Sequence, residues 1–143
     1  MPYLGLLHEL AMCDVLDVTA SDNTLTHVLT DPVLVEHLVA VYASVGEAIS
    51  GRAVVIEFLD ASNAVLVSHF GDLAQLGDLT RWYAIGRGLP SEGAFVAAVG
   101  QRPALLYRLE AGWKIRIRDG NGVTSNDTIR LLGTVRTLKP VRE

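Results

Sequence analysis

The sequence predicts an α+β domain, with one antiparallel sheet or a β-sandwich-like core, a main helix near residues 32–50, and short N-terminal and mid-chain helices. Three observations support this fold class. Apolar residues recur every three or four positions over 34–49, β-branched runs flank a turn at 60–63, and residues 113–118 alternate between apolar and cationic side chains. The 143 residues, half of them apolar, suffice for a single domain over 1–143.

The N-terminal segment is predicted to combine a short helix with a strand pair. Residues 3–13 place apolar side chains roughly on one side of a helix. The turn-favouring residues at 21–23 then separate two alternating segments, at 15–19 and 24–29. We expect these two segments to be strands that pair with each other.

The main helix is predicted to begin at Asp31 and Pro32, because Asp caps free amide groups and Pro suits the first helical position. Ser50 and Gly51 mark its end, since Gly readily takes the left-handed cap conformation. We expect the apolar stripe of this helix to pack over a sheet. The stripe consists of Leu34, Leu38, Val41, Tyr42, Val45 and Ile49.

The middle of the chain is predicted to form a hairpin followed by a long loop. β-Branched and aromatic residues at 52–59 and 64–70 favour two strands joined by the turn at 60–63. Because these strands carry few charges, we expect them to be central in the sheet. A Gly-rich loop follows as far as Gly93, with one short helix near 78–85, and its length favours a functional or assembly role.

The last part of the chain carries the clearest alternation. Trp113, Ile115 and Ile117 point to one side of a strand, while the cations between them point to the other side. Turn residues at 119–122 lead to a returning strand over 128–138. The stretch from Leu105 to Leu138 is therefore predicted to be a hairpin or meander with one free cationic face. Its cations are Arg108, Lys114, Arg116, Arg118, Arg130 and Arg136.

Charge is divided unevenly along the chain. Residues 1–100 hold three Arg against twelve Asp and Glu, a net charge of −9, whereas residues 101–143 hold nine Arg and Lys against four acidic residues, a net charge of +5. This division predicts contact with an anionic partner, or contact between the acidic part of one copy and the basic part of another. The alternative is that both surfaces simply face water.

No catalytic residue, cofactor or metal site is predicted. The single cysteine, Cys13, excludes a disulfide within the chain and a Cys-based metal site. His8 and Glu9 lack the second His that a zinc-protease helix needs four residues after the first. The turn that begins at Asp119 lacks the acidic twelfth ligand of a calcium loop, because that position is Arg130. No Gly-rich phosphate-binding motif occurs either.

Two alternative functions remain open. A small α+β enzyme or ligand-binding domain would enclose an apolar pocket and use His37, His69 or Asp60. A nucleic-acid-binding module would use the cationic face, but Trp113 lies on the opposite face and Tyr107 is out of register, which argues against a stacking platform. No segment has the length and apolar character of a membrane span or signal peptide, so no membrane contact is expected.

Four short motifs stand at Asp78–Trp82, Leu105–Leu109, Gly112–Arg116 and Thr128–Thr134. They resemble a pattern in small virion proteins of tailed bacteriophages, in which a Tyr-Ser-Arg-Trp-type helix precedes a strand, a Gly-Trp-[Lys/Arg]-Ile strand and a Thr-Leu-Thr-x-x-Gly-x-Leu strand. The likeness is confined to this part of the chain. It departs at 118–122, where an acidic residue and Pro often follow in the family.

The resemblance implies a non-enzymatic structural subunit of a bacteriophage virion, in the tail, baseplate or fibre-attachment region, assembled in the host cytoplasm. The implied partners are copies of the chain itself and other virion proteins. Arg81 and Trp82, which belong to the first motif, join the cations of the last part of the chain as candidate interaction residues.

Overall fold

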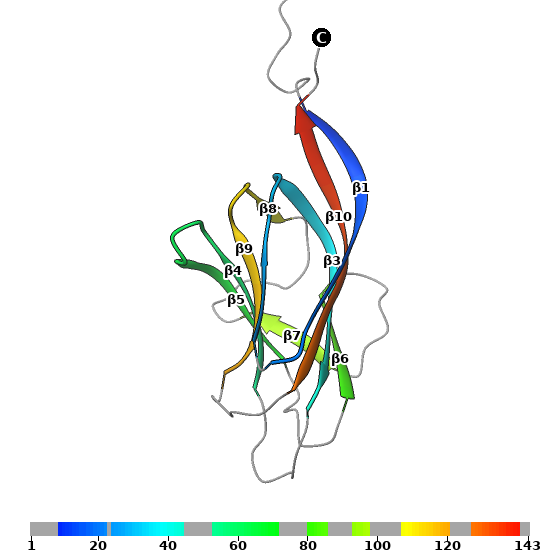
Figure 1. Ribbon diagram of the computed structural model, residues 1–143, viewed down its shortest axis with the longest axis vertical. Helices are drawn as coiled ribbons and strands as arrows, with labels where there is room; N and C mark the ends of the chain where they lie inside the picture. The colour runs from blue at the N-terminus through cyan, green and yellow to red at the C-terminus, as the bar shows by residue number, and fades with distance from the viewer. Residues whose placement is uncertain are drawn as a thin grey trace, which may run out of the picture.

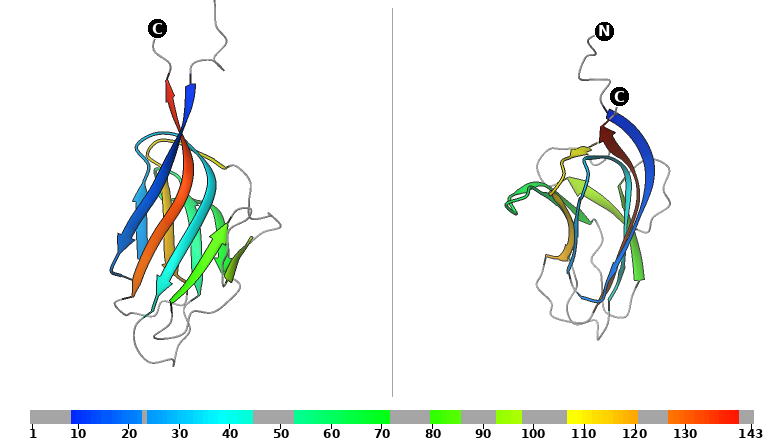
Figure 2. Two further views of the ribbon diagram at one scale, coloured as in Figure 1. Left: turned by 90° about the vertical axis from the view of Figure 1, so that its right-hand side faces the viewer. Right: turned by 45° about the horizontal axis from the view of Figure 1, so that its top comes forward.

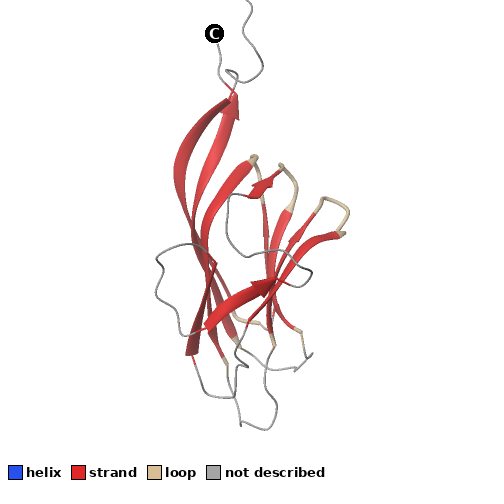
Figure 3. Cartoon of the chain, turned by 180° about the vertical axis from the view of Figure 1, so that it is seen from behind, coloured by secondary structure: helices blue, strands red, loops and turns tan. Residues whose placement is uncertain are grey.

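The computed structural model describes residues 9–22, 24–44, 53–71, 80–85, 93–97, 107–120 and 127–140. Within these residues the chain is all-β, so the α+β prediction is wrong (Figure 3). No helix in this part of the chain is long and apolar enough to cross a membrane. The strands are β1 (Glu9–Ala20), β2 (Thr24–Val28), β3 (Val33–Ala43), β4 (Val54–Leu59), β5 (Val65–Gly71), β6 (Thr80–Ile85), β7 (Gly93–Ala97), β8 (Tyr107–Leu109), β9 (Lys114–Asp119) and β10 (Thr128–Pro140).

The strands form two antiparallel sheets that face each other (Figure 1). Sheet A has the order β1-β10-β3-β6, and sheet B has the order β5-β4-β9-β2. Strand β7 pairs in parallel with β6 and antiparallel with β5, so it joins the two sheets along one side. Strand β8 pairs with the beginning of β3.

The strand pairs are nested along the chain. β1 pairs with β10, β2 with β9, β3 with β6, and β4 with β5, and successive pairs alternate between sheet A and sheet B (Figure 2). A long hairpin folded in this way over two sheets is a jelly roll. Strands β1 and β2 stand at the two ends of the strand order, each as the edge of its sheet.

The core lies between the two sheets. Strand β9 alternates between buried and half-buried residues, as the two-residue period of a strand requires, and all six residues of β4 are buried. Burial of each large apolar side chain stabilises the fold by about 1.5–3 kcal/mol. The largest fully buried residues are Tyr42, Tyr83, Phe58, Leu25, Leu38, Ile56, Leu59, Ile115, Ile117 and Ile129.

The prediction of a main helix over 32–50 is wrong. Residues 33–43 form β3, which pairs with β10 on one side and with β6 and β8 on the other. The segment contains four valines, whose branched side chains suit a pleated strand better than a helix. The predicted end of the helix, at 45–50, lies outside the described residues.

A β-bulge interrupts the alternation of β3. The register with β10 passes from His37 to Val35, so that Glu36 is left over. Before the bulge the buried residues are Val33 and Val35, and after it they resume at Leu38 and continue at every second position. Both faces of β3 carry apolar residues, so the predicted helical stripe combines Leu38 of the inner face with Leu34 and Val41 of the outer face.

The other predicted helices and the first strand pairing are also corrected. Residues 9–13 belong to β1, while 1–8 lie outside the described residues. Residues 80–85 form strand β6 instead of a helix. The segments predicted at 15–19 and 24–29 are strands, but they pair with β10 and β9 in different sheets, because the turn between them carries the chain from sheet A to sheet B.

The predicted central hairpin is confirmed as β4 and β5, and β4 lies between β5 and β9. Asp60 organises its turn, because Oδ1 accepts hydrogen bonds from the backbone amides of Ser62 at 2.8 Å and Ala64 at 2.9 Å. Hydrogen bonds from Ser62 and Ala64 lower the pKa of Asp60. Asn63 adopts a left-handed φ of 70°, which Asn tolerates well.

The basic hairpin predicted over 105–138 does not form. Residues 114–119 are β9 of sheet B, whereas 128–140 are β10 of sheet A, and the two strands do not pair with each other. The alternation within β9 is nevertheless confirmed, since Ile115 and Ile117 are fully buried. After β9 the chain therefore crosses to the other sheet instead of turning back.

A buried hydrogen bond closes the core near the beginning of β10. Tyr42 Oη donates to Asp127 Oδ2 at 2.8 Å, and both residues are fully buried. We expect Tyr42→Phe to lower the free energy of unfolding by about 1–3 kcal/mol, because a buried carboxylate oxygen loses a hydrogen bond. Urea denaturation measures the change, and an unaltered midpoint would contradict this expectation.

Candidate interaction surfaces

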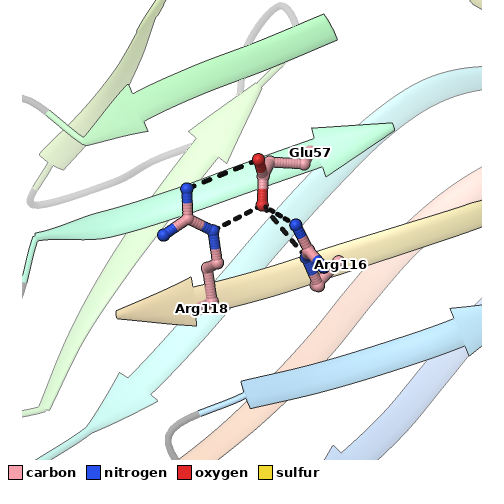
Figure 4. A network of polar contacts seen from close by, with 3 residues as sticks. All are labelled: Glu57, Arg116 and Arg118. Carbon is pink, nitrogen blue, oxygen red and sulfur yellow. Dashed lines mark hydrogen bonds and ion pairs between the residues drawn. The ribbon is translucent and has the colours of Figure 1, made fainter. Parts of the chain in front are cut away.

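Two arginines of β9 hold one buried glutamate of β4 on the outer face of sheet B (Figure 4). Arg116 donates to Glu57 Oε1 from Nε at 3.0 Å and from Nη2 at 2.9 Å. Arg118 donates from Nε to Oε1 at 2.6 Å and from Nη2 to Oε2 at 3.4 Å. The Glu57 side chain is 4% exposed, whereas those of Arg116 and Arg118 are 30% and 34% exposed.

The two arginines favour the ionised form of Glu57 despite its burial. Burial alone would raise the pKa of Glu57, but hydrogen bonds from Arg118 and Arg116 outweigh burial and hold the pKa below its usual value of 4.5. Glu57 is therefore ionised at neutral pH. Two guanidinium groups against one carboxylate leave one net positive charge, and the partly exposed guanidinium groups can donate to an external anion.

The remaining predicted cations also have partners within the chain, so the cationic face is neither free nor continuous. These residues lie on β8, β9 and β10, which belong to both sheets. The hydrogen bond from Arg130 lowers the pKa of Asp17. The pairs are Arg108 with Glu110, Arg130 with Asp17, Arg136 with Glu36, and Lys114 with Asn63.

Arg81 and Trp82, the other two predicted interaction residues, lie next to each other on β6 and point to opposite faces of sheet A. Arg81 stands opposite the buried Tyr42, and its Nε is itself buried without a hydrogen-bond acceptor among the described residues. Trp82 stands opposite Val41 on the outer face and is 48% exposed. Trp82 is therefore the more accessible of the two residues, because Arg81 is half-buried.

Trp82 belongs to an apolar strip on the outer face of sheet A. The cross-strand register places Leu132 beside Val39, Val39 beside Ala84, and Val41 beside Trp82. We call these five residues the sheet A strip. The Arg130–Asp17 ion pair lies directly beside it, and the Arg136–Glu36 ion pair lies further along the same face, beyond Thr134. An apolar centre with a charged rim is typical of a protein interface.

Strand β1 lies beside this strip as an edge of sheet A. It has twelve residues and pairs with β10 along its whole length, without a register shift. The pairing of β3 with β10 ends where Val33 lies opposite Thr137. The pairing of β1 with β10 extends beyond this point, as far as Glu9 and Pro140 (Figure 1). Val15 of β1 is 78% exposed. The described part of sheet A thus ends in a long and accessible strand edge.

A cavity of about 230 Å³ lies where β1 and β2 approach each other. Thr137 Oγ1 donates to Asp14 Oδ2, and Lys139 forms an ion pair with Asp31 at 2.8 Å. Burial lowers the pKa of His27, which is therefore neutral at pH 7. The other lining residues are Val15, Leu16, Leu29, Thr30, Val33 and Val135. In the described residues no group of three His, Cys, Asp or Glu could hold a metal ion.

The three residues that the sequence suggested for an enzyme or ligand-binding pocket lie away from this cavity. Asp60 caps the β4–β5 turn. His69 is fully buried and packs edge-on against Phe58, with ring centroids 5.7 Å apart, and burial lowers its pKa. His37 stands at the bulge of β3. None of Asp60, His69 and His37 lines the cavity between β1 and β2.

The sheet A strip, the edge of β1, the Glu57 cluster and the cavity are thus the candidate sites of this chain. The strip and the edge are contiguous, because β10 lies between β1 and β3. Comparison of the sequence with protein-family models and with curated proteins gives no match. Evidence for function therefore comes from these surfaces and from the short sequence motifs.

Proposed function

We propose that this chain is a non-enzymatic structural subunit of a bacteriophage virion, in the tail, baseplate or fibre-attachment region, that acts through contacts with copies of itself and with other virion proteins. The main observation in support of this proposal is the outer face of sheet A. There, an exposed tryptophan and a row of aliphatic side chains share the face with ion pairs and continue to an accessible strand edge. This combination suits burial against another protein surface.

The architecture and the motifs support the same role. Jelly rolls occur in viral capsid domains, but also in lectins and cupins, so the fold alone does not define a function. The motif at Gly112–Arg116 corresponds to the beginning of β9, and the motif at Thr128–Thr134 lies within β10. Their likeness to small virion proteins favours the virion among the functions that a jelly roll serves.

The pairing of the cations favours a protein partner over a nucleic acid. Arg116 and Arg118 share Glu57, and Arg130 is held by Asp17. Binding to nucleic acid draws its affinity from cations that neutralise phosphates. Arg130 and Arg136 are each neutralised by a carboxylate and contribute little to such binding, and the Glu57 cluster keeps a single net positive charge. The apolar sheet A strip, by contrast, gains free energy from burial against another protein.

Quantitative mass spectrometry of purified particles, from the phage whose genome encodes this chain, tests the proposal. We expect the chain at a fixed ratio to the other tail proteins. We further expect Trp82→Glu to reduce its incorporation at least tenfold, because a charge would be buried in the interface. Val65→Glu, at a valine of β5 that is 46% exposed, is the matched control and should be incorporated normally. A chain that stays in the lysate and is absent from particles would refute the virion role.

A further inference from the structure

No described strand pairs with the outer edge of β1, and this edge lacks several of the features by which proteins prevent strands from adding to a sheet. Edge strands are usually protected by proline, lysine, a bulge or short length, and also by charged residues, of which β1 has Glu9, Asp14 and Asp17. The β1 sequence ELAMCDVLDVTA contains neither proline nor lysine, and its ladder with β10 has no register shift. Its twelve residues are about twice the usual strand length. The edge can therefore accept a long additional strand.

We propose that β1 pairs antiparallel with β1 of a second copy, so that sheet A continues through both chains. The inference names the homomeric contact within the proposed assembly role, although the pairing itself does not depend on a virion. A two-fold axis perpendicular to the sheet relates the two copies, and the same edge serves both of them. Each β1 thereby gains a hydrogen-bonded neighbour on its open side.

The charges of β1 restrict the register of this pairing. A pair centred on Asp14 or on Asp17 would place two carboxylates directly opposite each other, which is destabilising. A pair centred on Val15 places Asp14 opposite Leu16 of the second copy and Asp17 opposite Cys13 of the second copy. No acidic residue then faces another acidic residue. Val15, which is 78% exposed in the single chain, then faces Val15 of the second copy.

A second charge interaction favours the same register. Arg136 of β10 stands opposite Cys13 within one chain. In the pair centred on Val15, Cys13 stands opposite Asp17 of the second copy, so that Arg136 and this Asp17 are two strands apart, about 10 Å between Cα atoms. The small Cys13 side chain leaves the path between them open. The long Arg136 side chain, which is 55% exposed and pairs with Glu36 of its own chain, can therefore also extend across the interface between the two β1 strands.

Light scattering coupled to size-exclusion chromatography tests the pairing in the full chain. We expect the wild-type chain to be a dimer and Val15→Lys to be a monomer, because two lysines would face each other at the axis. Val28→Lys is the matched control, since Val28 is also an exposed valine, at 50%, on the edge strand of the other sheet. It should remain a dimer. A wild-type chain that is monomeric up to its solubility limit, or a dimer that survives Val15→Lys, would overturn the proposal.

Oxidative cross-linking tests the register. In the double variant Val15→Cys, Cys13→Ser, the two introduced thiols face each other at a Cα separation of about 5 Å, which a disulfide can span. We expect this variant to form a covalent dimer under mild oxidation. In the wild-type chain the two Cys13 residues lie about 14 Å apart and should stay reduced. Cross-linking through Cys13 but not through position 15 would contradict the register. Because particle mass spectrometry is independent of both assays, a failed pairing leaves the virion role separately testable.

Discussion

Replacing Gly133 with valine is expected to lower the free energy of unfolding by about 3 kcal/mol, since insertion of atoms into a packed sheet forces the backbone to move. Gly133 of β10 stands opposite Leu38 of β3 and Leu16 of β1. A Cβ atom at this position would lie 2.5 Å from the backbone oxygen of His37 and 2.8 Å from Cδ2 of Leu38. The carbonyl group cannot yield as a flexible side chain can, because it belongs to the bulged segment of β3.

Urea denaturation of the Gly133→Val variant measures this effect. Thr134→Val provides the control, because the next residue of β10 is half-buried and points to the opposite face of the sheet. We expect the control to change stability by no more than about 0.5 kcal/mol. Equal denaturation midpoints for Gly133→Val and the wild type would show that the close approach of β3 and β10 is not required.

The second large effect is expected at Glu57. Glu57→Gln keeps the shape of the side chain but removes the charge that holds Arg116 and Arg118, and we expect a loss of about 2 kcal/mol of stability. The partial exposure of both arginines limits the loss, because water screens their repulsion. A double-mutant cycle with Arg118→Met should give a positive coupling energy. Additive effects of the two changes would contradict the cluster described here.

The Glu57 contribution should also depend on pH. The folded protein holds the pKa of Glu57 below its usual value of 4.5, so the folded state releases this proton more readily than the unfolded state does. The stabilisation is therefore complete above about pH 4.5 and is lost as the pH falls through the lowered pKa. We expect the stability difference between wild type and Glu57→Gln to shrink below pH 4.5. A difference that stays constant from pH 7 to pH 3 would contradict the lowered pKa. Because both proteins contain Asp17 and Asp60, their titrations cancel in this comparison.

Local sequence patterns predicted strands where a uniform period and a good turn coincide. The β4–β5 hairpin follows from its branched residues and from Asp60, and the buried side of β9 follows from Ile115 and Ile117. The pattern failed at β3, because apolar residues occupy both faces of this strand, so that Leu38 on the inner face and Val41 on the outer face also fit a helical stripe. The abundance of valine in that segment was the available signal for a strand.

The candidate surfaces were harder to predict, because they depend on pairing between distant segments. The alternating cations of β9 were visible, but Arg116 meets Glu57 only when β4 and β9 become neighbours. Similarly, the sheet A strip joins residues of β3, β6 and β10, and the sequence pattern predicts helices for the first two of these segments. Nothing in a single sequence states that Val41 and Trp82 lie side by side.

The pairing of the first described strand with the last one has a consequence for how the protein is made. Glu9 pairs with Pro140, and Ala20 pairs with Ile129. During synthesis β1 is complete long before β10 exists, so sheet A cannot close until the ribosome has released residue 140. Contacts between such distant residues slow folding, because the loop between them must first be ordered. During synthesis there is therefore a long interval in which β1 has no β10 to pair with. We expect chaperones that bind exposed strands to act in that interval.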